Sequence, residues 1–179
     1  FFAPGATAEA TWVVTVPSSD LDAGALLTMT TKASYANTSG GAAVGVFGNA
    51  STLLVEPRYG VSMTNASGDT TSSQTDLTVG ATVTLNLTVS NAGNAPDLVD
   101  ITTSVSGGSA PEAWVCQTYR ADGATPLVGK LGPIEADGSE DVEVHCYLPI
   151  GAAATTADTS IAVTASSDAN PDESATFTH

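Results

Sequence analysis

The sequence is poor in basic residues, aromatic residues and cysteine. Only four of its 179 residues are Lys or Arg, against 19 Asp and Glu, so the formal net charge is −15. A surface of this charge repels phosphate groups, which argues against nucleic acid or anionic lipid as a partner. No apolar run approaches the roughly 20 residues that a membrane-spanning helix needs. We therefore expect no membrane insertion by this chain.

Signals of catalysis are equally scarce. The chain has two histidines, and it contains no serine-hydrolase elbow, paired-histidine zinc motif or phosphate-binding loop. His145 directly precedes Cys146, but adjacent residues of a strand point to opposite faces, so the imidazole cannot easily activate the thiol. We expect no enzymatic activity and no required cofactor. We also expect the paired carboxylates to be solvated surface; they are Asp97 with Asp100 and Glu140 with Asp141.

The dominant pattern is the alternation of apolar and polar residues. Between residues 82 and 90, Val and Leu alternate with Thr and Asn, which is the period of a strand with one face in a core. No stretch has comparable helical periodicity, and clusters of Gly, Asn and Pro separate short segments of this kind. The pattern predicts an all-β, antiparallel sandwich. The predicted strands are 9–16, 26–35, 50–55, 58–64, 82–90, 97–105, 113–119, 140–148, 159–166 and 173–178.

The first 55 residues of the chain repeat the last 46 or so, whereas the middle occurs once. The sequence therefore predicts a partial immunoglobulin-like β-domain of three strands at 1–56 and one complete immunoglobulin-like β-sandwich domain at 57–179. Internal repeats are typical of arrays and polymers rather than of enzymes with one pocket. The aligned segments are 5–17 with 138–149, 29–34 with 161–166, and 50–55 with 174–179.

Two parts of the second domain resemble a known family. Residues 58–64 (RYGVSMT) and 78–97 (TVGATVTLNLTVSNAGNAPD) look like the opening of the cell-adhesion-related immunoglobulin-like repeats of bacterial and archaeal surface proteins. Residues 137–149 (DGSEDVEVHCYLP) and 161–167 look like the closing half of the same repeat. The resemblance implies a sandwich outside the cell, used as a stalk, adhesin, filament subunit or spacer beside a glycosidase. It brings no catalytic residues.

Cys116 and Cys146 are the only cysteines, and we expect them to form a disulfide. Cys146 shares one face of its strand with Val142 and Val144, and Cys116 shares a face with Trp114. Both sulfurs should therefore point into the core beside a buried Trp, as in a structural disulfide of an oxidising, extracytoplasmic compartment.

One acidic cluster has the spacing of calcium ligands. Asp168, Asn170 and Asp172 follow a D-x-N-x-D pattern, whose oxygen side chains can converge on Ca²⁺ from a tight loop. The pattern lacks the glycine and the final Glu of an EF-hand loop, so an ordinary hairpin rich in Asx residues is the alternative.

Four N-x-S/T sequons are candidate glycosylation sites. High Ser and Thr content, 44 of 179 residues, is typical of exposed and often glycosylated β-proteins. Unmodified polar residues are the alternative. The candidate residues are Asn37, Asn49, Asn65 and Asn86.

The half-domain suggests how such a chain could function. Three strands with one apolar face and open edges are marginal in water and invite pairing. We therefore expect a structural subunit of an extracellular filament or surface layer, a homopolymer that grows head-to-tail by β-strand complementation between subunits. The alternative is a spacer or adhesive module of a longer cell-surface protein or secreted glycosidase. Phe1 and Phe2 align with a strand entry, so we expect the chain to begin inside a domain; the expected interface residues are Phe1, Phe2, Trp12, Val14 and Val16.

Overall fold

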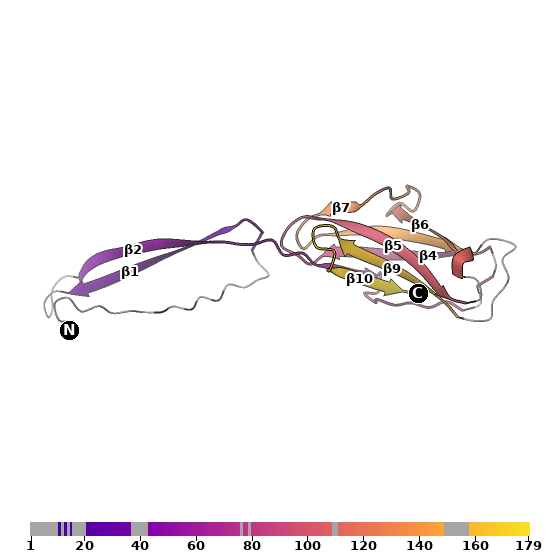
Figure 1. The fold of residues 1–179 in the computed structure, drawn as a ribbon, viewed down its shortest axis with the longest axis horizontal. Coiled ribbons are helices and arrows are strands. Elements are labelled where there is room, and N and C mark those ends of the chain that lie inside the picture. Colours follow the sequence, from indigo (N-terminus) through magenta and orange to yellow (C-terminus); the bar gives the residue numbers. More distant parts are fainter. Residues whose placement is uncertain are drawn as a thin grey trace.

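The computed structural model describes two bodies, a two-stranded hairpin and a β-sandwich, joined by a short linker (Figure 1). The residues it describes are Thr11, Val13, Thr15, 21–36, 43–75, 77–78, 80–108, 111–148 and 158–179.

The sandwich contains two antiparallel four-stranded sheets. The first sheet has the order β3-β4-β8-β6 and the second has the order β10-β9-β5-β7. A single turn of 3-10 helix, η1 (Pro111–Ala113), lies between β5 and β6. The strands of the first sheet are β3 (Val61–Asn65), β4 (Thr82–Asn91), β6 (Val115–Arg120) and β8 (Ser139–Tyr147), and those of the second are β5 (Asp97–Gly107), β7 (Leu131–Ile134), β9 (Thr159–Ser167) and β10 (Ser174–Thr178).

The core lies between these two sheets. On β4 every second residue is buried, and the register places Val83, Leu85 and Leu87 opposite buried residues of β8. The second sheet contributes alternate residues of β9 and Phe177 of β10. The predicted period of two therefore corresponds to an inward and an outward face. This arrangement confirms the all-β, immunoglobulin-like sandwich.

The strand predictions differ from the structure at β2, at β7 and at residues 9–16. Strand β2 begins at Ala43, seven residues before the predicted strand 50–55. Strand β7 was not predicted, because its sequence Leu-Gly-Pro-Ile contains two turn-forming residues. Proline is tolerated there because β7 is an edge strand. At the predicted strand 9–16, Thr11, Val13 and Thr15 are described, and they lie outside any strand.

The hairpin consists of β1 (Leu26–Ala36) and β2 (Ala43–Leu54), which form a sheet of their own. Its register differs from that of the aligned strands β9 and β10. The repeat would place Ala50 opposite Ser34, as Ser174 lies opposite Ser166, but Ala50 lies opposite Thr30. From Leu26 to Thr30 the shift is four residues, an even number that keeps the paired residues on the same face. From Lys32 onwards, beyond an irregularity in the pairing, the shift is five.

Candidate interaction surfaces

Cys116 and Cys146 form a disulfide, as predicted. They lie directly opposite each other on the neighbouring strands β6 and β8, so the bond lies within one sheet. In antibody domains the corresponding bond joins the two sheets. Cys146 is buried, whereas Cys116 and Trp114 are half-buried against the core, less than expected for Trp114. A disulfide of this kind is typical of oxidising compartments outside the cytosol.

His145 lies between a carboxylate and an aromatic ring. Its Nε2 lies 3.0 Å from Oε2 of Glu143, and its ring packs on Tyr119 with the centroids 4.6 Å apart. The adjacent Cys146 is buried and disulfide-bonded, so it holds no free thiol. The other histidine, His179, has its Nδ1 2.7 Å from the hydroxyl of Ser72, and burial lowers its pKa.

The acidic pairs do not share one environment. Asp100 and Asp141 are exposed, and the Asp141 carboxylate accepts a hydrogen bond from the Thr88 hydroxyl. The prediction of a solvated surface was wrong for Asp97, which is only 4% exposed because it lies at the start of β5, where β7 pairs with this strand. Its Oδ1 accepts a weak hydrogen bond from the Ala169 N–H at 3.3 Å, and its Oδ2 has no hydrogen-bond partner among the described residues.

The Asp168 loop is stabilised by hydrogen bonds of its own. The Asp168 carboxylate pairs with the ammonium group of Lys130, and the Asn170 N–H donates to the Ser167 hydroxyl at 2.9 Å. In the described part of the chain, no three His, Cys, Asp or Glu side chains are placed to hold a metal ion. Calcium binding by Asp168, Asn170 and Asp172 stays a prediction, with Lys130 as a competitor for the first carboxylate. A rise of the thermal midpoint with millimolar Ca²⁺ would support it.

The four sequons lie in different settings. Asn86 is exposed on the outward face of β4, and Asn49 lies on β2. The Asn65 side chain is half-buried, and its oxygen accepts the N–H groups of Ser67 and Asp69 in the turn after β3. Asn37 lies outside the described residues. Their glycosylation stays a prediction.

The expected interface residues also lie outside the described part of the chain. These are Phe1, Phe2, Trp12, Val14 and Val16.

The hairpin presents leucines to solvent on both of its faces. Leu27 lies opposite Leu53, and one residue along, on the other face, Leu26 lies opposite Leu54. Leu26, Leu53 and Leu54 are 68%, 63% and 58% exposed, and Met29, on the face of Leu27, is 43% exposed. Large apolar side chains gathered on an isolated two-stranded sheet are typical of an interaction surface.

Asn94 attaches the hairpin and the linker to the sandwich. Its side-chain oxygen accepts the Arg58 N–H at 2.6 Å, and its amide donates to the carbonyls of Leu21 and Glu56. Its backbone N–H donates to the Arg58 carbonyl and its carbonyl accepts the Ala23 N–H at 2.8 Å. One residue therefore binds the segment before β1 and the segment after β2.

Two neighbours of Asn94 hold it in place. Asn91 is fully buried, and its side chain donates to the carbonyls of Ala95 and Ile134 and accepts the Gly93 N–H. A Cβ on Gly93 would collide with the Arg58 carbonyl, so glycine is required for the linker to approach this turn. The sequence predicted a turn here but gave no signal of its role, because its partners lie far away in the chain.

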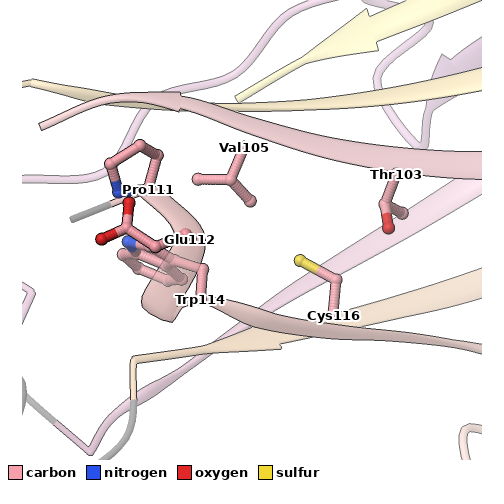
Figure 2. Close-up of a pocket in the computed structure, with 6 residues that line it drawn as sticks. All are labelled: Thr103, Val105, Pro111, Glu112, Trp114 and Cys116. Atoms are coloured by element: carbon pink, nitrogen blue, oxygen red, sulfur yellow. The ribbon is translucent and has the colours of Figure 1, made fainter.

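A groove opens between the two sheets beside the second half of β5 (Figure 2). It has a volume of about 400 Å³ and lies between β5, η1 and β6. Val105 and Thr103 line it from β5, and Cys116 of β6 and Trp114, which directly precedes β6, line the facing side. Pro111 and Glu112 of η1 lie at one end of the groove. The sequence pattern did not predict this groove.

Compared with models of known protein families and with curated proteins, the sequence matches none. Among the residues that the structure describes, no helix has both the length and the apolar character needed to cross a membrane.

Proposed function

We propose that this chain is a non-catalytic structural subunit of an extracellular filament or surface layer, and that it polymerises head-to-tail by β-strand complementation between subunits. The observation that carries the proposal is the β1–β2 hairpin, a two-stranded sheet with solvent-exposed leucines attached to one end of a complete sandwich. An isolated hairpin of this kind is marginally stable in water, and pairing with another chain buries its apolar face.

Three further observations support an extracellular, polymeric role. The disulfide fits an oxidising compartment. The two bodies are fixed to each other through Asn94, and a defined geometry at this joint favours a regular polymer over a flexible one. The resemblance of residues 58–97 and 137–167 to cell-adhesion-related immunoglobulin-like repeats is consistent with a surface protein.

Burial of the hairpin leucines provides the free energy for assembly. Each fully buried leucine side chain contributes roughly 1.5–3 kcal/mol relative to an exposed one. Leu27, Met29 and Leu53 share one face, and they form a contiguous apolar surface next to the linker. A contact between one end of a subunit and the other end of the next propagates into an open polymer.

The test compares the assembly of two double variants. One variant replaces apolar residues on one face of the hairpin, and the other replaces polar residues on the opposite face. Leu27→Asp with Leu53→Asp should abolish polymers in negative-stain micrographs of the full chain. The matched control, Thr28→Asp with Thr52→Asp, adds the same charge to directly opposite residues of the other face and should preserve them. Equal assembly by both variants would contradict the proposal.

A spacer or adhesive module of a longer surface protein is the second candidate. The Asn94 attachment favours it as well, because a fixed joint between two bodies also suits a stalk. A full chain that stays monomeric at all concentrations would support this candidate.

A further inference from the structure

We propose that the free edge of β5, from Asp100 to Gly107, and the groove beside it form the acceptor site for the β1–β2 hairpin of a second copy of this chain. This inference rests on the head-to-tail assembly proposed above and adds the surface at which it occurs.

In the part of the chain that the structure describes, β5 has a long edge without a partner strand. Strand β7 pairs with β5 only at Asp97 and Val99, and in the described ranges no other strand pairs on that side of β5. Of the outward residues along this edge, Asp100 at its start is acidic, whereas Thr102, Ser104 and Ser106 are small and polar. The edge has none of the lysines or prolines that usually protect an edge.

Two other edges of the sandwich are covered by short segments of the chain. Residues 70–72 pair with the end of β10, where the Ser72 N–H donates to the Thr178 carbonyl and the Thr178 N–H donates to the Thr70 carbonyl. Residues 125–127 cover the end of β6 through hydrogen bonds to Thr118 and Arg120. The stretch of β5 from Asp100 to Gly107 therefore differs from these edges, because among the described residues no such segment covers it.

The core is incompletely covered along the same stretch. The inward residue Val99, which pairs with β7, is fully buried, but beyond the end of this pairing the inward residues Ile101, Thr103 and Val105 are only half-buried. On the neighbouring strand β9, the inward residues Ile161 and Val163 are fully buried. One more strand beside β5 would extend the sheet over the groove and complete this side of the sandwich.

Charge identifies the hairpin of a second copy as the occupant. The sandwich domain, residues 57–179, carries fifteen acidic and three basic residues. Residues 23–55, which include the whole hairpin, carry no acidic residue and one basic residue, Lys32. Two chains of formal charge −15 repel each other. The hairpin is a long segment without acidic residues, so the acidic sandwich of a second chain does not repel it.

The spacing of the side chains on β1 also matches that on the proposed acceptor strand β5. On β1, Leu27 and Met29 are two residues apart and share a face with Leu53 of β2. On β5, Thr103 and Val105 are two residues apart and line the groove. A strand that adds to the edge of β5 has its alternate side chains over the groove, so β1 can pair with β5 and insert Leu27 and Met29.

The positions of the two surfaces favour a polymer that does not close on itself. Asn94, which attaches the hairpin, precedes the first residue of β5, whereas the groove lies along the second half of that strand. Figure 1 shows η1 as a coiled ribbon at the end of the sandwich opposite the hairpin. Each subunit therefore presents a donor at one end and an acceptor at the other.

The first experiment compares Val105→Asp, which places a charge in the groove, with Ser104→Asp, which places it on the outward face of the same strand. In sedimentation experiments on the full chain, Val105→Asp should raise the concentration needed for half-assembly at least tenfold, and Ser104→Asp should change it less than twofold. A thermal melt shows whether each variant is folded. If folded Val105→Asp assembles like wild type, the acceptor is elsewhere and this inference fails, while head-to-tail assembly stands.

The second experiment does not require a charge in the groove. A chain with Met29→Cys is mixed under oxidising conditions with a chain carrying Thr103→Cys, and peptide mass spectrometry identifies the joined positions. We expect a disulfide between positions 29 and 103 of different chains. The yield of a disulfide between position 29 and the control Thr176→Cys on β10 should be at least tenfold lower. Equal linkage to position 176 would overturn the inference, and a wild-type chain that never assembles would overturn both this inference and the proposed function.

Discussion

The side-chain oxygen of Asn94 accepts the backbone N–H of Arg58 at 2.6 Å, and this hydrogen bond attaches the linker to the sandwich. The same side chain donates to the carbonyls of Leu21 and Glu56. The direction in which the hairpin leaves the sandwich therefore depends on one partly exposed residue. In a polymer, this direction sets the angle between successive sandwiches.

Replacement of Asn94 should loosen the joint and leave the sandwich intact. We expect Asn94→Ala to accelerate amide hydrogen exchange at Arg58, because its N–H loses its acceptor. The free energy of unfolding of the sandwich should fall by no more than about 1 kcal/mol, since the lost bonds lie near the surface. Hydrogen exchange measured by NMR and a denaturant titration check both expectations.

Asn91 provides the contrasting variant. Asn91→Ala leaves the buried carbonyls of Ala95 and Ile134 without their donor. Each unsatisfied buried group costs roughly 1–3 kcal/mol, so this variant should destabilise the sandwich much more than Asn94→Ala does. Equal destabilisation by the two variants would contradict the distinct roles assigned to them.

The disulfide should make a large contribution to the stability of the sandwich. Cys116 and Cys146 are 30 residues apart, and closing a loop of this length stabilises by about 3.5–4 kcal/mol in the chain-entropy model. Replacement of both cysteines by serine should lower the free energy of unfolding by about that amount. In the native protein, a thiol-alkylating reagent should modify neither cysteine before reduction and both after it. Modification before reduction would show that the bond is absent.

Asp122 should titrate at unusually low pH. The hydroxyl and N–H of Thr125 and the N–H of Ala124 donate to its carboxylate, and these bonds lower its pKa from 3.8 to about 2. The depressed pKa stabilises the folded state above about pH 3.8, and this contribution is lost as the pH falls towards 2. An NMR titration of the Asp122 carboxyl checks the value. Thr125→Val should raise the pKa, and an unchanged pKa in that variant would disprove the role of the hydroxyl.

The sequence was sufficient to predict those elements whose pattern is local. The alternation around Val83 and Leu85 predicted β4 and its buried face, and the inward faces of Cys116 and Cys146 predicted the disulfide. Strand β7 was missed because Gly132 and Pro133 are typical of turns, and the unpaired edge of β5 follows from the shortness of β7. The role of Asn94 has no local signature, since its partner carbonyls lie 38 and 73 residues away in the sequence.

The hairpin register could not be predicted from the repeat either. The pairing of β1 with β2 is interrupted by a bulge between Thr30 and Lys32. Gly48 lies against Thr31 at this point, and a side chain on Gly48 would collide with the Thr31 hydroxyl. The aligned strands β9 and β10 pair without such an interruption, so their register does not transfer to β1 and β2.

Sedimentation velocity of the full chain beside residues 57–179 tests the central claim most directly. All buried apolar residues identified in the core belong to residues 63–177, so the shorter chain retains every one of them. We expect residues 57–179 to sediment as a single folded monomer and the full chain to form larger species that increase with concentration. A full chain that sediments as a folded monomer at every concentration would contradict the claim that the hairpin drives assembly.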